Sequence, residues 1–328
     1  MSIRHMDGFR KYVDSGALNT KLARVYSSIL SGDITYAAGR YATSGGFLLY
    51  ADTGDNGGFS LALSASGVTK FIHGFCVKAT GSAPRQETKY QITGGGTSAL
   101  VLSDAGVSVN ATAKGDLGLN DGEWHHVEWV QYASGTDSLY VDGVLIATQV
   151  STAFGTAVRW FVDGDDIVAG YQISDWYILD NTGTANNVRL GPEARVETLL
   201  PSADDATQQW SVSGAANAFN VLDNVPDNSG QFIGSNADNQ IAQVQFTNLT
   251  GITTVAGIQL SALAKNEDGG TLKKLNFVKG GTEVGAEWTP TTSLGLQTRI
   301  LEENPSTDLP WTPTNVNGLV AGLKSKTE

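Results

Sequence analysis

The chain contains the run Asp121-Gly122-Glu123-Trp124-His125-His126-Val127-Glu128-Trp129-Val130, and a second run, Leu139-Tyr140-Val141-Asp142-Gly143-Val144-Leu145-Ile146, follows shortly after it. Aromatic and β-branched residues, which favour strands, dominate both runs. Asp-Gly is the dipeptide that adopts φ > 0 at both central positions of a type I′ turn, and this turn matches the twist of paired strands. The two runs therefore predict a β-hairpin.

Length and composition indicate a two-domain β protein. At 328 residues the chain exceeds the size at which a single core usually stops growing. Its 39 glycines and its low charged fraction of 16% are typical of a turn-rich β protein. One cysteine, Cys76, excludes an intramolecular disulfide and fits assembly in a reducing cytoplasm. We see no signal peptide and no apolar run of about 18 residues, so we expect a soluble chain without membrane insertion.

The charge balance argues against a nucleic-acid partner. The formal net charge is −12, and the 21 lysines and arginines form no cluster beyond Lys273-Lys274. Binding to phosphates requires a basic surface that neutralises them. We therefore expect no nucleic acid among the partners of this chain.

Strand-like runs recur along the chain at roughly the 8–12-residue spacing of a sandwich or barrel. In the first half they cover residues 46–51, 59–63, 70–78, 89–93, 99–102, 107–113, 158–162 and 171–179. In the second half they cover residues 195–200, 208–212, 231–234, 241–247, 255–264, 272–278 and 296–301. A polar, glycine-containing stretch at residues 180–187 suits a domain boundary. We expect an N-terminal arm over residues 1–30, a jelly roll over residues 31–187 and a second β-sandwich over residues 188–328.

Two local patterns refine the second domain. In residues 255–264 the even-numbered positions are apolar and should point to the core, and Asp268-Gly269-Gly270 predicts a turn that pairs this strand with residues 272–278. Thr312 is a candidate helix N-cap before Pro313, and apolar residues follow at helical spacing, namely Val316, Leu319, Val320 and Leu323. The predicted fold class is all-β: two antiparallel β-sandwich (jelly-roll) domains in tandem, with a short C-terminal helix.

The carboxylates do not form the pair that a retaining glycosidase needs. Such enzymes place two carboxyl groups about 5–5.5 Å apart. Glu123 and Glu128 are separated by an odd number of positions, so a regular strand sends them to opposite faces. Asp163, Asp165 and Asp166 cluster around a glycine, which is typical of a solvated turn. We expect no catalytic residue and no enzyme activity.

The histidines and the cysteine do not form a metal or nucleophile site. His125 and His126 are adjacent on a strand, so they point to opposite faces and cannot chelate one ion together. We expect one to be partly buried beside Trp124 or Trp129 and the other to face water. Cys76 lies in an apolar run and is interpreted as a small buried hydrophobe. We expect no cofactor.

The seven tryptophans are the remaining candidates for ligand contact. Exposed aromatic rings form platforms on which sugars stack, but most tryptophans of a sandwich belong to its core. Those within strand patterns are interpreted as structural: Trp124, Trp129 and Trp176. Those nearer strand ends or loops are candidates for contact with a glycan or a neighbouring chain: Trp160, Trp210, Trp288 and Trp311.

The letters WHHV followed by LYVDG resemble the central hairpin of laminin-G and concanavalin A-like jelly rolls, and this resemblance covers about the first 185 residues. The run Ile173-Ser174-Asp175-Trp176-Tyr177-Ile178-Leu179-Asp180, followed by Leu190-Gly191 and Arg195-Val196, resembles the close of the laminin-G-like domain in structural proteins of tailed bacteriophages. Later segments agree with it: Val225-Pro226-Asp227, Phe232-Ile233, Glu303-Asn304-Pro305, Pro310-Trp311-Thr312, Val316-Asn317 and Ala321-Gly322-Leu323-Lys324.

The resemblance implies a non-enzymatic structural component of a bacteriophage virion, on the capsid surface or in the tail or fibre. Such a protein is assembled in the host cytoplasm, contacts other virion proteins and usually forms a homo-oligomer. We expect residues 1 to about 30 to dock to neighbours. The alternative is a glycan-binding adhesin that recognises a bacterial surface polysaccharide, and a glycosidase is disfavoured by the missing carboxylate pair.

Laminin-G-like domains also bind calcium through loop oxygens, so the resemblance leaves a calcium ion as an alternative to the absence of metal. Asp52, Asp55 and Asn56 form one candidate loop, and Asp163 and Asp165 form another. Neither loop has a specific ligand spacing, and we name no metal ligand.

Overall fold

The computed structural model forms two compact units, Met1–Thr198 and Leu199–Glu328. It describes residues 2–9, 12, 18, 22–23, 25–30, 33–41, 44–50, 57–81, 87–93, 98–163, 170–222, 230–267 and 273–326. Antiparallel strands dominate these ranges, and the helices α2 (Ala218–Leu222) and α3 (Pro313–Asn317) have five residues each. The predicted all-β class is confirmed. No helix within the described ranges has the length and hydropathy needed to cross a membrane.

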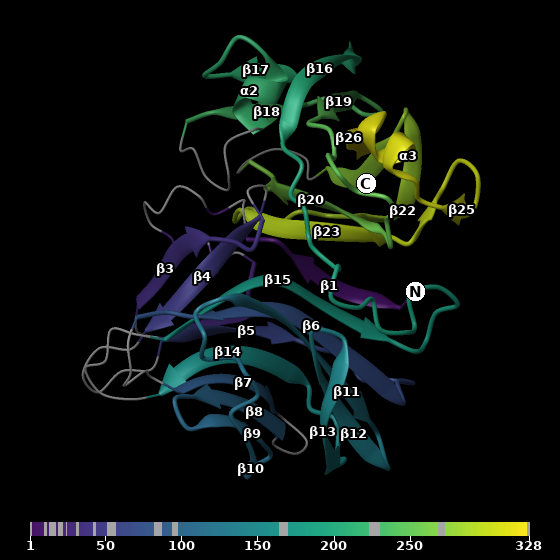
Figure 1. Cartoon of the computed structure of the whole chain (residues 1–328). Coiled ribbons are helices and arrows are strands. Elements are labelled where there is room, and N and C mark those ends of the chain that lie inside the picture. The colour runs from purple at the N-terminus through teal and green to yellow at the C-terminus, as the bar shows by residue number, and fades with distance from the viewer. Residues whose placement is uncertain are drawn as a thin grey trace. The chain divides into compact units, whose positions relative to one another are not determined.

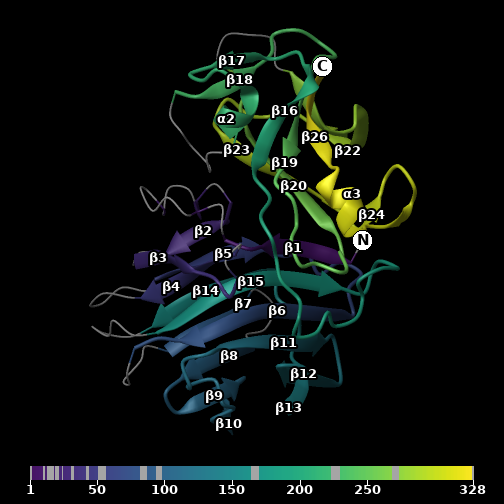
Figure 2. The same cartoon turned by 45° about the horizontal axis from the view of Figure 1, so that its top comes forward.

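The first unit is a sandwich of two antiparallel sheets (Figures 1 and 2). The eight-stranded sheet has the order β13-β12-β11-β6-β15-β4-β3, with β1 also paired to β15. Its strands are β1 (Ile3–Asp7), β3 (Asp33–Ala38), β4 (Gly45–Tyr50), β6 (Lys70–Ala79), β11 (Trp124–Tyr132), β12 (Thr136–Val141), β13 (Val144–Val150) and β15 (Tyr171–Asp180). The seven-stranded sheet has the order β10-β9-β8-β7-β14-β5-β2. Its strands are β2 (Ser28–Leu30), β5 (Gly58–Ala62), β7 (Glu87–Thr93), β8 (Ser98–Ser103), β9 (Gly106–Val109), β10 (Thr112–Gly115) and β14 (Ala157–Asp163).

The predicted hairpin is present and extends over three strands. β11 pairs with β12, so that Trp129 faces Leu139, and β12 pairs with β13. Asp142 and Gly143 join β12 to β13 with φ values of 46° and 82°. Both values are positive, as a type I′ turn requires.

Large aromatic side chains fill the space between the two sheets. Trp129, Trp160 and Trp176 are fully buried, and the ring centroids of Tyr90 and Trp160 lie 4.7 Å apart. The Tyr90 hydroxyl lies 2.8 Å from His73 Nδ1 and accepts a hydrogen bond from the Trp176 indole at 3.3 Å. Aromatic rings bury large apolar areas, so this core holds the sandwich together without a disulfide.

The N-terminal segment belongs to the first sandwich, which differs from the separate arm expected over residues 1–30. β1 pairs with β15, and Phe9, Tyr12 and Tyr26 are buried in the core. The buried Asp7 carboxylate accepts hydrogen bonds from the Phe9 amide at 2.9 Å and the Tyr26 hydroxyl at 2.7 Å. Large apolar residues that the structure describes in this segment therefore belong to the core of the sandwich and are not free to dock to neighbours.

The boundary between the units also lies later than expected, after Thr198 rather than after residue 187. The reason is a set of hydrogen bonds to the first sandwich. Leu190 and Gly191 donate their amides to the buried Glu128, and Val196 donates its amide to the buried Asp175. The polar stretch at residues 181–187 is thus followed by a segment that remains bound to the eight-stranded sheet.

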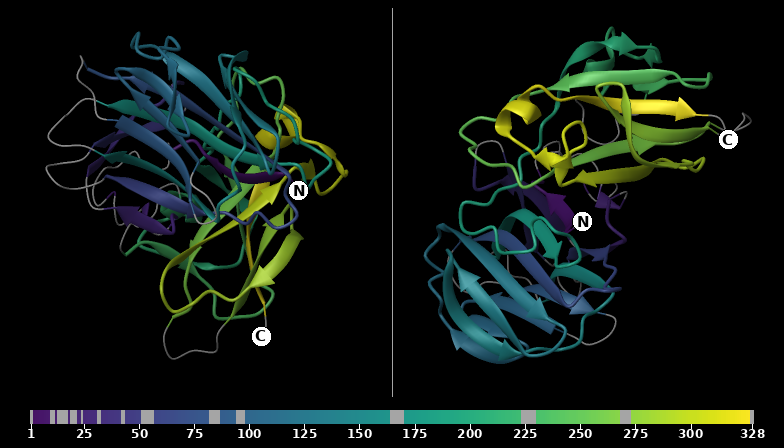
Figure 3. Two further views of the ribbon diagram at one scale, coloured as in Figure 1. Left: turned by 90° about the horizontal axis from the view of Figure 1, so that it is seen from below. Right: turned by 90° about the vertical axis from the view of Figure 1, so that its right-hand side faces the viewer.

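The second unit has a five-stranded antiparallel sheet in the order β16-β19-β26-β21-β22. Its strands are β16 (Pro201–Gln208), β19 (Ile241–Phe246), β21 (Lys274–Lys279), β22 (Thr282–Trp288) and β26 (Val320–Lys326). Three strand pairs complete the unit: β17 (Ser211–Ser213) with β18 (Phe232–Gly234), β20 (Ile258–Ala264) with β23 (Gly295–Leu301), and β24 (Glu303–Asn304) with β25 (Leu309–Pro310). Figure 3 shows β26 in yellow, running through the sheet.

The core of this unit lies between the five-stranded sheet and the β20–β23 pair. Leu260 is buried against Phe277 and Val284, and Ile258 and Ala262 pack on the same cluster. The apolar even-numbered face of residues 255–264 therefore points inward, as predicted from its alternation. The partner of this strand is different from the predicted one, because β20 pairs with β23 and not with β21.

The hairpin that includes β21 is formed with β22, through Gly280 and Gly281. Their φ values are 54° and 81°, which glycine adopts without steric cost. The Asp268-Gly269-Gly270 turn predicted from the sequence lies outside the described residues.

The predicted short C-terminal helix is present as α3, with five residues. The Thr312 side chain accepts the Asn315 amide, and Pro313 occupies the first turn. The helix ends at Asn317, and Val320 and Leu323 belong to β26 instead. Glycine at position 322 allows β26 to lie close to the neighbouring β19, because a Cβ atom there would lie 1.8 Å from the Ala242 carbonyl oxygen.

Candidate functional site

The two adjacent histidines occupy separate environments. His126 is 1% exposed, its Nε2 lies 3.1 Å from the Tyr177 hydroxyl, and burial lowers its pKa to about 4. His125 lies between two carboxylates, with Nδ1 2.7 Å from Asp142 and Nε2 3.0 Å from Asp121. The prediction that they share no ion is consistent with these partners. The expectation that one faces water is wrong, because the His125 side chain is only 15% exposed.

We expect His125 to make stability depend on pH above 6.5. Burial alone would lower the pKa of His125, but hydrogen bonds to Asp142 and Asp121 outweigh it and raise this pKa above 6.5. A raised folded-state pKa adds stability that is fully present below pH 6.5, the pKa of the unfolded chain. This stability is lost as the pH rises through the pKa of the folded chain. Urea unfolding at rising pH should show a loss of a few tenths to about 1 kcal/mol. His125→Gln should remove this loss, and an unchanged profile in this variant would contradict the assignment.

Glu128 is a structural carboxylate. It is fully buried, and its Oε1 accepts hydrogen bonds from the Leu190 amide at 2.8 Å and the Tyr177 hydroxyl at 3.0 Å. Its Oε2 accepts from Arg189 Nη1 at 3.1 Å, and the Arg189 guanidinium lies 3.6 Å from the centroid of the Tyr140 ring. Both oxygens are occupied, while Glu123 is exposed before β11. Glu123 and Glu128 therefore form no catalytic pair.

A second buried carboxylate, Asp175, binds the same segment, residues 189–196, to the eight-stranded sheet. It accepts the Val196 amide at 2.9 Å, and burial raises its pKa to about 6. Arg40 donates to the Pro192 carbonyl at 2.7 Å and lies 3.5 Å from the Cys76 sulfur. Burial still raises the pKa of the Cys76 thiol, so this cysteine is the inert buried residue that the sequence predicted.

The candidate calcium loops lie outside the part of the chain that can be described. This applies to Asp52, Asp55, Asn56, Asp165 and Asp166, and to the side chain of Asp163. Within the described ranges, no group of three or more His, Cys, Asp or Glu side chains is placed to hold a metal ion.

The tryptophans offer little surface for a sugar. Trp160 and Trp311 are 0% and 3% exposed, so they are core residues and not the contact candidates that their sequence positions suggested. Trp210 and Trp288 are half-buried, and the Trp210 indole donates to the Gln240 carbonyl at 3.0 Å. Trp129 and Trp176 are fully buried, as predicted.

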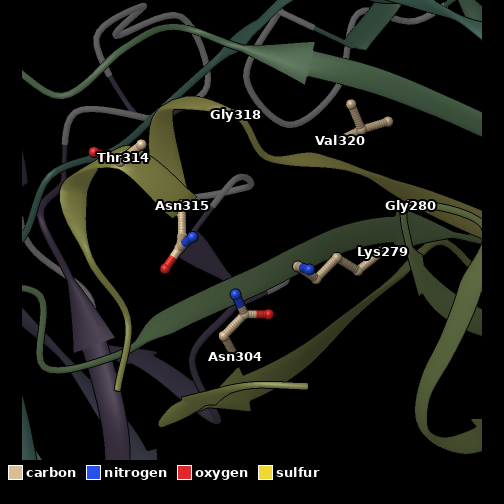
Figure 4. Close-up of a pocket in the computed structure, with 7 residues that line it drawn as sticks. All are labelled: Lys279, Gly280, Asn304, Thr314, Asn315, Gly318 and Val320. Carbon is tan, nitrogen blue, oxygen red and sulfur yellow. The ribbon is translucent and has the colours of Figure 1, made fainter. Parts of the chain in front are cut away.

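An open cavity of about 300 Å³ lies in the second unit. Its lining comes from the end of β21, from β24, from α3 and from the start of β26. The residues are Lys279, Gly280, Asn304, Thr314, Asn315, Gly318 and Val320. Figure 4 shows the side chains of Lys279, Asn304 and Asn315 directed toward the same space.

Three side chains of the lining carry hydrogen-bond donors: Lys279, Asn304 and Asn315. Asn304 is 4% exposed; its Oδ1 accepts the Ser306 amide at 3.1 Å, and its Nδ2 has no hydrogen-bond partner among the described residues. Asn315 Oδ1 accepts from the Thr312 hydroxyl at 2.8 Å, which leaves its Nδ2 as a donor. Lys279 Nζ donates to the Ser306 hydroxyl at 2.8 Å, and burial lowers the pKa of this lysine. The cavity is suited to a ligand rich in acceptor oxygens.

No sequence motif marks this cavity. Lys279 ends a strand, Asn304 follows a different strand, and Asn315 belongs to α3, so their convergence depends on the fold of the whole unit.

No protein-family model and no curated protein matches the chain. Among solved structures it is similar to the botulinum neurotoxin serotype C1 binding domain, at 11% identity over 90% of this chain and 93% of that chain, with a TM-score of 0.35. It is also similar to the binding domain of Paraclostridial Mosquitocidal Protein 1, at 11% identity over 67% and 70% of the two chains and a TM-score of 0.35. A lectin from Bauhinia forficata in complex with GalNAc shows 13% identity over 46% and 93%, with a TM-score of 0.33. Similarity at this level says nothing of what this chain binds.

Proposed function

We propose that the chain is a non-enzymatic glycan-binding protein that recognises a bacterial surface polysaccharide through the cavity at Lys279, Asn304 and Asn315. The observation that carries this proposal is the buried amide of Asn304, whose Nδ2 faces the cavity without a partner among the described residues. A donor that opens onto a cavity and is not bonded to a described residue can bond to an acceptor oxygen of a ligand.

The chemistry of the lining favours a sugar that carries a carboxylate. Two amide donors and one ammonium group face the cavity, and sugar hydroxyls and carboxylates supply the matching acceptors. Lys279 gives the site a local positive charge in a chain of net charge −12. The volume of the cavity lies at the lower end of the range typical of small-molecule sites, and it is enough for one or two sugar rings.

The test is binding of the full chain to purified bacterial polysaccharides, acidic and neutral, measured by calorimetry. We expect Lys279→Gln to weaken binding to an acidic polysaccharide by about tenfold to a hundredfold, the range for a lost charge-assisted hydrogen bond. Lys265→Gln is the matched control, because it removes the same charge from an exposed site in the same unit. Binding that Lys279→Gln leaves intact, or no binding to any acidic polysaccharide, would refute the proposal.

A second candidate function is structural: a component of a bacteriophage virion, on the capsid surface or in the tail or fibre, that acts through protein contacts. The sequence resemblance supports it, and so does a concentration of exposed apolar side chains on strand β13. We place the protein in the virion after assembly in the host cytoplasm. Immuno-electron microscopy and mass spectrometry of purified particles should find it at fixed copy number, and its absence from particles would exclude this role.

A further inference from the structure

Strand β13 forms an apolar edge of the eight-stranded sheet. It is the last strand in the sheet order, and its pairing among the described residues is to β12 (Figures 1 and 2). Val144, Leu145, Ile146 and Val150 are 61%, 51%, 37% and 72% exposed. The described ranges contain nine exposed large hydrophobic residues, and four of them lie on this strand. Single exposed hydrophobes are normal, but such a concentration marks an interaction surface.

The usual protections of an edge strand are weak here. Natural sheets shield their edges with charged side chains, prolines, bulges or covering segments. Residues 144–150 contain no charged residue and no proline. A register shift opposite Leu139 and Tyr140 makes Ile146 an extra residue, and Lys114 of β10 donates to the Thr148 carbonyl at 2.9 Å. The Lys114 contact lies in the second half of the strand, and the three consecutive exposed apolar residues that precede it, Val144, Leu145 and Ile146, form the open apolar part.

The charges on either side of this open part have opposite signs, so a two-fold axis through its centre would set each charge against the opposite charge of a second copy. Asp142 precedes the strand and bears a carboxylate, while Lys114 places an ammonium group at Thr148. These positions are each three residues from Leu145, on opposite sides. An antiparallel copy centred on Leu145 would therefore bring Asp142 beside the Lys114 ammonium twice, and no like charges would meet at the uncharged centre.

We propose that a second copy of this chain docks on β13, antiparallel to it, with the two-fold axis passing close to Leu145. The inference rests on the structural role proposed above and is independent of the glycan cavity. Leu145 packs against its own counterpart, and Val144 lies opposite Ile146 of the other copy. Because the open patch is short, we expect a dissociation constant in the micromolar range, which the high local concentration of an assembled particle would compensate.

The test is the mass of the full chain in solution, measured by sedimentation equilibrium. Wild type should be dimeric at high concentration, and Leu145→Lys and Leu145→Glu should each weaken the dimer at least tenfold, because the two-fold axis sets like charges against each other. An equimolar mixture of the two variants should regain the dimer through opposite charges. Val188→Lys is the matched control, since Val188 is 63% exposed in the same unit and is not part of β13.

Each alternative outcome overturns the inference. A wild type that stays monomeric, a dimer that Leu145→Lys leaves unchanged, or a mixture that does not recover would each exclude this contact. Circular dichroism of the variants checks that each is folded, and the mixture supplies a readout that a folding defect cannot imitate. Purified particles that contain the protein, together with a monomeric wild type, would overturn the dimer and leave the structural role standing.

Discussion

Glu128→Ala should lower the free energy of unfolding of the first unit by about 3 kcal/mol, at the lower end of the cost of breaking a buried ion pair. The substitution removes the acceptor for the Leu190 and Gly191 amides and for the Tyr177 hydroxyl. It also leaves Arg189 without its carboxylate. The Arg189 side chain is 31% exposed, so water can solvate part of the freed charge and the cost stays below that of a fully buried pair.

Urea unfolding gives the size of this loss, and hydrogen exchange at the Leu190 and Gly191 amides gives its location. Glu128→Gln should lose less stability than Glu128→Ala, because its carbonyl oxygen still accepts these amides. Some stability is still lost, because the charge opposite Arg189 is gone. Glu123→Ala is the matched control, since Glu123 is exposed near the start of the same strand. If Glu128→Ala were as stable as Glu123→Ala, residues 189–191 would be held by other contacts.

Much of the first sandwich could be predicted because its signals are local. The Asp142-Gly143 turn, the flanking aromatic runs and the alternation along each strand all report the conformation of a few neighbouring residues. Burial of Trp129 and Trp176 follows from their positions within those strands. Such signals fixed the class of the fold and the opening hairpin.

The remainder depends on contacts between distant parts of the chain. Nothing in the sequence near Glu128 indicates that the amides of Leu190 and Gly191 bond to it. Val320 and Leu323 fit a helical period in the sequence, and their place in β26 depends on pairing with the distant strands β19 and β21. The polar cavity also depends on distant parts of the chain, since Lys279 and Asn304 come together only in the folded unit.

The second large effect expected is a loss of stability in acid, caused by two histidines that are buried without charge. Burial lowers the pKa of His73 to about 3 and that of His126 to about 4. Below pH 6.5 the unfolded chain takes up protons at both side chains, while the folded chain does not until these lower values. Stability is therefore fully present above pH 6.5 and falls as the pH falls, by about 1.4 kcal/mol per pH unit for each histidine.

Buried carboxylates oppose this trend, which is why the decisive measurement is a difference between proteins. Burial raises the pKa of Asp175 to about 6 and also raises that of Asp137, so the folded chain takes up these protons first as the pH falls. His126→Gln keeps a side chain that can bond to the Tyr177 hydroxyl but removes one proton from the unfolded state. Between pH 6 and pH 4, its slope of unfolding free energy against pH should be lower than that of wild type by about 1.4 kcal/mol per pH unit.

His125→Gln is the control that separates burial from mere loss of a histidine. The raised pKa of His125 acts above pH 6.5, because below that pH this side chain is protonated in both the folded and the unfolded chain. His125→Gln should therefore leave the acid slope unchanged, and His126→Gln should leave the alkaline slope unchanged. If both variants changed the same part of the profile, the two adjacent histidines would not have the separate environments assigned to them. If His126→Gln retained the wild-type acid slope, His126 would not be buried without charge in the folded chain.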